Sequence, residues 1–448
     1  MTSSIWVNST VVFLIVCYAL IYLLGNRWAT AVTSYHVGNR RRILSVFKLE
    51  IIMTLFNIFV YHQLMQYFEV DNYQGKWDRR KLAKVKSRAS VGLFIFFFLS
   101  QLVYLMYYAS AEMQWLMFGV TTLASGIWTN LLAFVCGFFI INMFVRLCQK
   151  YEATTKLLNY FINIKYAGVL LLNRKVQIQF TVVITLILSF FMWISCDKVV
   201  VKYQTITVDN FSSDRQVLRF AVISDLHVGA SVHEQQVQKV SEMLLDMNID
   251  AVLVVGDMVD GPRSLLESRL KPFWSVARRF PTFFVTGNHE YYYGDVREWL
   301  HLYEENGVKV LQNQHTIIHG VCLVGINDIS SGKMGIVKHS MEPATAIQSC
   351  PKNMTTILMA HNPASVKDIS EEDLKNVDLI LSGHTHAGQF YVVVPLVWMS
   401  LPYYYGLYQL SHGQLMVSAG TLYQGPNMKM LGMSEIWRVS LQKTAPTM

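Results

Sequence analysis

The sequence predicts an α-helical multi-pass membrane region followed by an α/β domain with a layered sheet. Three observations support this fold class. The first half contains apolar runs long enough to cross a bilayer. In the second half, short runs rich in β-branched residues alternate with helix-like stretches, as is typical of α/β organisation. Five of those short runs end in Asp, His or Asn, which also predicts a polar site at the strand ends.

The composition separates the chain into two halves of different character. Its 448 residues are enough for two or three domains, and 52% hydrophobic with only 15% charged residues is too apolar for an ordinary soluble protein. Residues 1–215 carry a net charge of +12 and residues 216–448 a net charge of −4. Because the basic excess lies in the apolar half, it favours a membrane surface over nucleic acid. We therefore expect the lipid bilayer as a partner and expect no nucleic acid.

Residues 1–196 are predicted to form the membrane region, with about five transmembrane helices. The candidate spans are residues 5–24, 51–68, 91–108, a long run within 113–145, and 177–195. The first span has no basic flank and no small-residue cleavage site, so it does not resemble a removable signal peptide. The fourth is too long for one straight helix and contains Ser125-Gly126, so it could be tilted, kinked or re-entrant. Four or six spans remain alternatives.

The basic residues of the short loops predict the orientation. Loop 69–90 holds seven Lys or Arg residues and loop 146–176 holds six. A cytoplasmic N-terminus places these 13 on the cytoplasmic side and seven on the other side. The second half is therefore predicted to be lumenal or extracellular. Glycosylation sequons begin at Asn210 and Asn353 in that half, and Cys322 and Cys350 could pair in an oxidising compartment. The remaining cysteines are expected to be packing residues: Cys17, Cys136, Cys148 and Cys196.

The second half is predicted to contain one α/β domain. Residues 197–215 are expected to be a polar linker leading to an edge strand, residues 216–442 the domain, and residues 443–448 a tail. The patterns predict helices at 234–247, 265–279 and 295–306, and further strands at 321–326, 390–394 and 415–419. The nearly uncharged stretch PLVWMSLPYYYGLYQL (395–410) should either cover the core or form an apolar lip facing the bilayer or a lipid-like substrate.

The stretch AVLVVGDMVD (251–260) shows how the polar site is predicted. Its apolar residues fit a strand buried on both faces, and Asp257 and Asp260 follow the terminal glycine. Alone, this pattern would favour an aspartate that starts a helix after a core strand. However, it recurs in VLRFAVISDLH (217–227), TFFVTGNHE (282–290), TILMAHN (356–362) and VDLILSGHTH (377–386). Because strand ends meet at one edge of a sheet, five such tips would form one polar cluster that needs cations.

The side chains of this cluster predict a metal centre. Carboxylate, imidazole and amide groups together suit Mn, Fe or Zn, whereas Ca and Mg prefer oxygen ligands alone. Seven candidates are too many for one ion: Asp225, His227, Asp257, Asn288, His361, His384 and His386. Two ions that share a carboxylate are the arrangement used to hydrolyse phosphate esters. The pairs Asp225-x-His227 and His384-x-His386 would each supply two ligands from one extended tip.

Five motifs in this order resemble the calcineurin-like metallophosphoesterase family. They are SDLH (224–227), GDMVD (256–260), GNHE (287–290), AHNP (360–363) and GHTH (383–386). The resemblance covers about residues 216–442, and NHEYYYG and GHTHAGQ look most like the bacterial YkuE/YaeI-like branch. It implies a four-layer α-β-β-α sandwich and a hydrolase acting on ester bonds.

Carried over motif by motif, the resemblance implies two divalent metal ions in each chain. One ion would be bound by Asp225, His227, Asp257 and His386, and the other by Asp257, Asn288, His361 and His384, with Asp257 bridging the two. After attack by a hydroxide held between the metals, His289 would protonate the leaving oxygen as general acid, oriented by Asp260. Adjacent side chains of an extended tip point to opposite sides, which assigns Asn288 to the metal and His289 to the proton.

Some positions depart from the family pattern or have a simpler interpretation. Ala387 stands where the branch usually has a second glycine, and Ala419 where relatives often have arginine. The alanine at position 419 removes a candidate phosphate contact and weakens any inference about substrate.

Glu290 could tune the neighbouring acid or simply begin a helix. The histidines outside the motifs are expected to be surface or packing residues: His233, His301, His315, His319, His339 and His412.

The predicted function is that of a membrane-anchored, metal-dependent phosphohydrolase. Its predicted substrate is a phosphodiester, which could be lipid-linked. An alternative from another class is a membrane transport or receptor protein whose second half is a regulatory module. The interiors of the predicted spans contain no charged residue, so nothing resembles an ion relay or a solute pathway, and this favours anchoring. A phosphoprotein substrate remains a further alternative.

Overall fold

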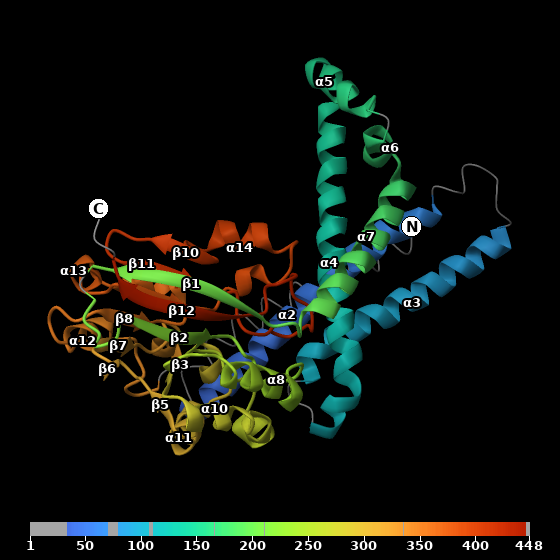
Figure 1. Cartoon of the computed structure of the whole chain (residues 1–448). Coiled ribbons are helices and arrows are strands. Elements are labelled where there is room, and N and C mark those ends of the chain that lie inside the picture. Colours follow the sequence, from blue (N-terminus) through green and yellow to red (C-terminus); the bar gives the residue numbers. More distant parts are fainter. Residues whose placement is uncertain are drawn as a thin grey trace. The chain divides into compact units, whose positions relative to one another are not determined.

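The computed structural model describes residues 34–69, 79–106, 111–164, 166–209, 211–334 and 336–444 (Figure 1). The predicted span 5–24, Cys17 and the sequon asparagine Asn210 lie outside the described residues. The described chain divides into two compact units, one formed mainly by residues 45–193 and the other mainly by residues 194–444. Each unit is described by itself below.

Long apolar helices make up the first unit. The elements are α2 (Ser34–Met65), η1 (Gln66–Phe68), α3 (Arg79–Met106), α4 (Ala111–Cys148), α5 (Glu152–Ile162), α6 (Ala167–Leu172) and α7 (Arg174–Ser195). Among the described residues, four helices are long and apolar enough to cross a membrane: Ile43–Phe68, Arg80–Tyr104, Met117–Cys148 and Arg174–Ser195. They correspond to the second to fifth predicted spans. The fourth predicted span corresponds to α4, which is one uninterrupted helix through Ser125-Gly126. It is therefore not a re-entrant loop.

Polar side chains connect these helices to one another. Asn57 of α2 donates to Gln101 of α3 at 3.1 Å and accepts from the indole N–H of Trp128 of α4 at 2.6 Å. Asn130 of α4 donates to Ser189 of α7 at 3.0 Å. Side-chain hydrogen bonds between helices of this kind satisfy polar groups that would otherwise face an apolar environment. These hydrogen bonds join α2 to α3, α2 to α4 and α4 to α7, and so hold the helices together.

The second unit consists of two sheets and short helices. The helical elements are α8 (Glu234–Leu245), α9 (Arg263–Leu266), η3 (Glu267–Leu270), α10 (Phe273–Arg279), η4 (His289–Tyr291), α11 (Val296–Glu305), η5 (Ser331–Met334), α12 (Pro343–Gln348), η6 (Pro363–Asp368), α13 (Glu371–Leu374), η7 (His386–Gly388) and α14 (Val394–Ser400). The first sheet has the order β1 (Val200–Val208), β12 (Glu435–Lys443), β2 (Val217–Ile223), β3 (Ala251–Val255), β4 (Thr282–Val285), β5 (Val308–Val310). The second has the order β10 (Gly406–Gln409), β11 (Gln414–Val417), β9 (Leu379–Ser382), β8 (Thr356–Met359), β7 (Val321–Gly325), β6 (Gln314–Ile318).

The two sheets pack face to face, with helices outside each (Figure 1). One apolar cluster contains residues of β2, β3 and β4 together with β7, β8 and β9, so it lies between the sheets. A second cluster packs α8, α10 and α11 on the other face of the first sheet, and a third packs α12 on the second sheet. Strands covered on both faces explain the continuous apolar runs of the sequence. The expected four-layer α-β-β-α sandwich is confirmed.

In each sheet, neighbouring central strands run parallel. β2 pairs with β3 and β3 with β4 in parallel, as do β7 with β8 and β8 with β9. All five predicted site strands are present, and four of them are shorter than the apolar stretch from which they were predicted because the chain turns before the polar residues. Parallel pairing brings their carboxyl ends to one edge of each sheet, which is where ligands bind in open α/β sheets.

Other expected elements differ from the structure. Residues 390–394 do not form a strand: the chain turns there, and Pro395 lies at the start of α14. A run of β-branched residues is a weak indicator of a strand, whereas proline in the first helical turn fits a helix start. The predicted helix 265–279 is divided into the three short helices α9, η3 and α10. The segment 197–215, expected as a linker, contains strand β1, which pairs in parallel with β12.

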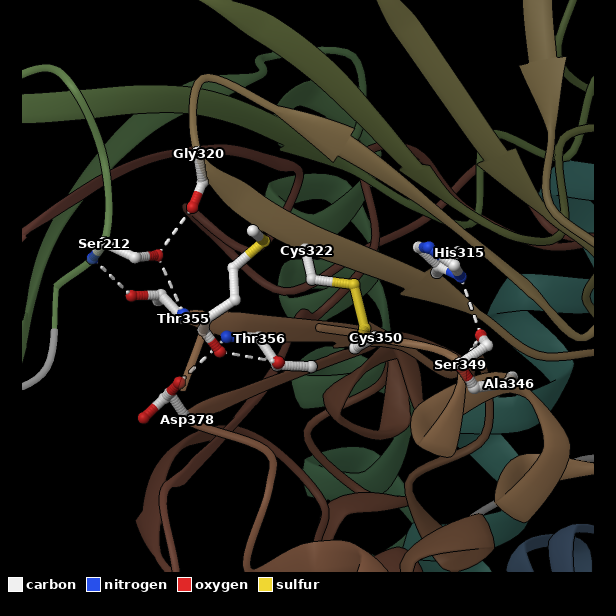
Figure 2. Close-up of a disulfide and its surroundings, with 11 residues drawn as sticks. Ser212, His315, Gly320, Cys322, Ala346, Ser349, Cys350, Thr355, Thr356 and Asp378 are labelled. Carbon is white, nitrogen blue, oxygen red and sulfur yellow. Dashed lines mark hydrogen bonds between the residues drawn. A yellow bond between two sulfur atoms is a disulfide. The ribbon is translucent and has the colours of Figure 1, made fainter. Parts of the chain in front are cut away.

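Cys322 of β7 and Cys350 form a disulfide (Figure 2). The bridge joins the second sheet to the segment that follows α12, with a Cα–Cα distance of 6.1 Å. Nearby, Ser212 and Thr355 exchange hydrogen bonds of 3.0 and 2.9 Å between backbone N–H and hydroxyl groups. Among the described residues, the cysteines outside this disulfide are Cys136, Cys148 and Cys196.

Candidate metal centre

The polar residues follow the strands in sharp, left-handed turns. Asp225 and His227 after β2 have φ of 53° and 48°, and His384 and His386 after β9 have φ of 71° and 50°. The two pairs therefore do not have the extended geometry that the sequence suggested. Non-glycine residues at positive φ cost energy and persist where the surroundings impose them. Here, the backbone N–H of Asp225 donates to Gly256 O and that of His227 donates to Asp257 O, both at 3.0 Å, so neighbouring tips hold each other.

Two glycines allow the tips to approach this closely. A Cβ on Gly287 would lie 2.1 Å from Oδ1 of Asp257, and a Cβ on Gly383 would lie 2.3 Å from Oδ2 of Asp225. A Cβ on Gly287 would also lie 2.5 Å from the backbone N of Asp257, and one on Gly383 would lie 2.7 Å from Cβ of Ser224, so any larger residue would displace the neighbouring tip. The glycines of GNHE and GHTH are thus required by the packing of one tip against the next.

The first group of ligand-type side chains consists of Asp225, His227 and His386. Nε2 of His227 lies 2.9 Å from Nε2 of His386, and Nε2 of His386 lies 3.4 Å from Oδ1 of Asp225. All three residues are buried. The three ligand atoms lie within 4.8 Å of one another, a separation that one cation could bridge.

The second group consists of Asp257, His361 and His384. Oδ2 of Asp257 lies 3.1 Å from Nε2 of His361. The same oxygen is 3.7 Å from Nε2 of His227, so the Asp257 carboxylate adjoins the first group as well. Nδ1 of His361 is fixed at 2.8 Å from the carbonyl of Val255, which leaves Nε2 directed at the carboxylate.

Buried polar atoms at these tips fit a cation. In the described part of the chain, Oδ1 of Asn288 is buried and has no hydrogen-bond partner. The amide of Asn288 uses its nitrogen to donate to Tyr292 Oη at 2.8 Å, which frees the oxygen. An unpaired buried acceptor is costly, and a metal ion would satisfy it. Six of the seven predicted ligands belong to the two groups and Asn288 lies on the GNHE tip, although their individual roles stay predictions.

His289 and Asp260 form a separate pair beside the groups. Nδ1 of His289 lies 2.7 Å from Oδ1 of Asp260, and Tyr293 Oη also donates to that oxygen at 3.3 Å. On the other side of the ring, Nε2 lies 2.7 Å from Nε2 of Gln424. His289 opens the helical turn η4 and Asn288 has right-handed helical φ and ψ, so this tip is not extended either. Since His289 also lies within ligand distance of His227 and Asp257, spacing alone does not decide its role.

Glu290 is more than a residue that begins a helix. Its side chain is 1% exposed, and its carboxylate accepts hydrogen bonds from the backbone N–H groups of Gly287 at 2.7 Å, Met258 at 2.8 Å and Asp257 at 3.1 Å. It therefore ties the GDMVD tip to the GNHE tip. Burial and the charge of Asp257 raise the pKa of Glu290 to about 7, against the effect of the amides. The sequence offered no way to see this role.

Three further residues that sequence reasoning missed lie close to the site: Gln389 follows η7, and Gln424 and Lys429 follow β11. Gln389 donates from its amide nitrogen to Gln424 O at 3.0 Å and accepts from Gln424 N–H at 3.0 Å, so it positions the residue that contacts His289. Lys429 is completely buried, and its ammonium donates to the carbonyls of Gly420 and Leu422. Burial lowers the pKa of Lys429 to about 7. None of these residues belongs to a ligand-type motif, so composition and spacing gave no signal for them.

The pKa shifts of His227, His384 and Asp257 favour the neutral imidazole and ionised carboxylate forms that bind metals, whereas that of His361 favours a protonated ring. Burial, reinforced by His289, lowers the pKa of His227 to about 3, and burial lowers that of His384 to about 4. Burial alone would raise the pKa of Asp257, but His361 and His289 hold it well below its usual value. For His361 the balance is reversed: burial opposes protonation, but the charge of Asp257 raises its pKa well above the usual range. A cation between them would replace that proton.

The fold and the site together define the class of protein. Residues 218–388 match the family model of the calcineurin-like phosphoesterases, so the second half of the chain contains a calcineurin-like phosphoesterase domain. The resemblance drawn from the five motifs is thereby confirmed.

The chain is also similar to three curated proteins. The chain is 32% identical over 246 residues to a protein of Danio rerio named transmembrane protein with metallophosphoesterase domain, covering 53% of this chain and 56% of that protein. Its identity to the protein of the same name from Bos taurus is 33%, covering 50% and 53%. A putative metallophosphoesterase of Caenorhabditis elegans is 28% identical over 368 residues, covering 80% of this chain and 74% of that protein. The chain thus spans a little over half the length of the two vertebrate relatives.

Proposed function

We propose that this protein hydrolyses a phosphodiester at a centre of two divalent metal ions, Mn, Fe or Zn. The observation that carries the proposal is the position of Asp257. Its Oδ2 lies 3.1 Å from Nε2 of His361 and 3.7 Å from Nε2 of His227, so one carboxylate adjoins both ligand groups. A carboxylate shared by two ions is the arrangement that phosphoesterases use.

Each residue would have a specific part in the reaction. Asp225, His227 and His386 would hold one ion, and Asn288, His361 and His384 the other, with Asp257 shared. When bound, the ions would act as Lewis acids on water and on the phosphoryl oxygens. His289 would deliver a proton from Nε2 to the departing oxygen while Asp260 fixes the ring through Nδ1. For this, the Gln424 amide would have to present its oxygen to Nε2, since only an acceptor can face a protonated nitrogen.

A diester suits the charges available at the site better than a monoester. The motifs SDLH, GDMVD, GNHE, AHNP and GHTH contain no Arg or Lys. The buried Lys429 donates to two backbone carbonyls, and Ala419 replaces a candidate arginine. A phosphate diester carries one negative charge and a monoester close to two, so a diester needs less positive charge beyond the metals.

The catalytic unit is proposed to lie on the lumenal or extracellular side of the membrane. The Cys322–Cys350 disulfide supports this side, because disulfides persist in oxidising compartments and are rare in the cytosol. The Lys and Arg distribution of the loops points the same way.

The test uses the purified full-length chain in detergent, loaded with Mn, Fe or Zn after treatment with a chelator. We expect hydrolysis of bis-p-nitrophenyl phosphate to exceed that of p-nitrophenyl phosphate and of a phosphopeptide, and to disappear in chelator. His361→Ala should abolish turnover, whereas His412→Ala, at a histidine outside the site, should not change it. Preference for the phosphopeptide would favour a phosphoprotein phosphatase, and absence of turnover with every metal would contradict the proposal.

A further inference from the structure

Helix α14 presents apolar side chains that the described residues leave exposed to solvent. Leu396, Trp398 and Met399 are 62%, 66% and 69% exposed. Tyr391, just before the helix, and Leu431, in a neighbouring loop, are 42% and 51% exposed. We call these five residues the apolar lip. The stretch 391–410 contains no charged residue. Contiguous exposed apolar side chains of this kind mark a surface that is covered in the working protein.

The lip is connected to the end of an apolar helix. α7, one of the helices able to cross a membrane, ends at Ser195, whose hydroxyl donates to Lys429 O at 3.0 Å. The carbonyl of the next residue, Cys196, accepts from Ser434 Oγ at 2.6 Å. The exposed Leu431 lies between these two attachment points, and its backbone N–H donates to Tyr391 Oη at 3.1 Å. The lip is therefore held within a few residues of the point where α7 ends.

The other side of the lip adjoins the candidate metal centre. The first turn of α14 packs against η7, which carries His386: a Cβ on Gly388 would lie 3.2 Å from Val394 N. Between them, the carbonyl of Gln389 accepts from Met430 N–H at 3.0 Å. The Gln389 side chain holds Gln424, whose amide contacts His289 at 2.7 Å. One continuous set of contacts thus joins the lip to the residue proposed as general acid.

We propose that the apolar lip is inserted in the interfacial layer of the membrane that α7 enters, and that the phosphoester hydrolysed beside it belongs to a lipid headgroup. The chain itself selects the bilayer as the occupant. α7 ends in a segment hydrogen-bonded on both sides of Leu431, so the membrane boundary must lie close to the lip. Trp, Tyr and Leu are residues that favour the membrane interface, and Lys198, exposed just after α7, suits a headgroup layer.

Membrane insertion does not depend on the proposed function, whereas the identity of the substrate does. The first experiment therefore measures position alone. Trp398→Cys and, as a matched control, Leu245→Cys are made in the full-length chain, labelled with an environment-sensitive fluorophore and reconstituted in vesicles. Leu245 is 37% exposed at the end of α8 that leads into β3, opposite the site tips. Parent protein carried through the same labelling gives the background from native cysteines.

Nitroxide-bearing lipids should quench the label at residue 398 and leave the label at residue 245 unaffected, while aqueous iodide should do the reverse. Equal quenching of both labels by iodide would overturn the insertion, whatever the enzyme hydrolyses.

The second experiment addresses the substrate. The double variant Trp398→Ser and Met399→Ser should lose about tenfold or more of its rate on a phosphodiester headgroup in vesicles, since two interfacial side chains are removed. Its rate on soluble bis-p-nitrophenyl phosphate should stay unchanged. An equal loss on both substrates would contradict the lipid assignment and indicate a lip that only supports the fold. Absence of turnover in the parent enzyme on both substrates would contradict the proposed function, and the quenching result would still decide the insertion.

Discussion

Nδ1 of His289 lies 2.7 Å from Oδ1 of Asp260, and both side chains are buried beside the two ligand groups. With Nδ1–H donated to the carboxylate, the other ring nitrogen is the one available to exchange a proton. The carboxylate also accepts from Tyr293 Oη at 3.3 Å, which restricts its rotation. This arrangement is that of a positioned proton donor.

His289→Ala should lower kcat by about 10²–10⁴-fold, the usual contribution of a general acid, while the fold and the metal content are kept. The loss should depend on the leaving group. An alkoxide needs a proton to depart, whereas p-nitrophenolate is stable without one. Rates on alkyl phosphodiesters should therefore fall much further than rates on p-nitrophenyl esters, which steady-state kinetics with both substrate types would measure.

Asp260→Asn should reproduce that pattern more weakly, because Asp260 acts only by orienting the imidazole. Metal analysis of both variants is the control. If His289→Ala loses a metal ion, or loses the same factor on both substrates, His289 is a ligand or a substrate-binding residue instead. Its distance from His227 and Asp257 makes that alternative a real outcome of the experiment.

Asp257→Asn should lose metal and activity together. Its carboxylate adjoins both ligand groups, so removing its charge weakens the sites for both ions. Elemental analysis of the purified variant should show fewer than two ions per chain. Asp246→Asn, at an exposed carboxylate after α8, is the matched control and should keep both. Ordinary turnover with full metal content in Asp257→Asn would mean that the residue only shapes its turn.

Glu290→Gln should destabilise the protein although it changes few atoms. The carboxylate accepts hydrogen bonds from the N–H groups of Gly287, Met258 and Asp257, and an amide would turn an NH₂ group toward some of these donors. The cost should be about 1–3 kcal/mol in the free energy of unfolding, as for other buried groups left without a partner. Thermal unfolding of the metal-free protein measures it. Glu304→Gln, at an exposed position of α11, should have no effect, and a Glu290→Gln variant equally unaffected would disprove the role.

Much of the domain could be predicted because its strands are buried on both faces. Burial imposes apolar runs, and parallel pairing then places the residues that follow each run at a common edge. This reasoning predicts that Asp225, Asp257, Asn288, His361 and His386 gather at the strand ends. Residues 390–394 were misread because a β-branched run also fits the turn before α14, and only tertiary contacts decide between them.

The detailed geometry of the site could not be predicted for a different reason. The positive φ of Asp225, His227 and His384 is imposed by hydrogen bonds between tips that are far apart in sequence. Glu290 and Gln424 owe their roles to contacts with other tips, not to any local pattern. Spacing can suggest which residues gather, but not how each backbone turns to bring them together.

Lys429 should make the stability of the metal-free protein depend on pH. Burial lowers its pKa in the folded state to about 7, whereas in the unfolded chain it keeps the ordinary lysine pKa of 10.5. Between these values the unfolded state binds more protons, so the free energy of unfolding should rise with pH from about 7 to about 10.5. Below pH 7 Lys429 is protonated in both states, so the free energy of unfolding is reduced by the full cost of burying its charge.

The comparison with Lys429→Met isolates that contribution from other titrating groups. Denaturant unfolding in chelator, measured at several pH values, should give a shallower rise for the variant than for the parent over this window. Parallel curves would mean that Lys429 keeps an ordinary pKa in the folded protein, for instance through the nearby carboxylates of Glu435 and Asp225.

The side of the membrane is tested best through Asn353, which lies three residues after Cys350. It begins the sequon Asn353-Met-Thr, is exposed, and has a φ of 65° that asparagine and aspartate tolerate better than most residues. If the catalytic unit is lumenal, the oligosaccharide transferase can reach this site. We expect an endoglycosidase to shift the mobility of the parent protein by one glycan more than that of Asn353→Asp, which keeps the sequon at Asn210. Asn376→Asp, at an exposed asparagine outside any sequon, should keep the full shift.

Protease added to sealed vesicles in which the cytoplasmic face is outside should leave this unit intact until detergent is added. Digestion without detergent, together with a thiol-reactive rather than disulfide-bonded Cys322, would place the unit in the cytoplasm, because a structural disulfide is not maintained there.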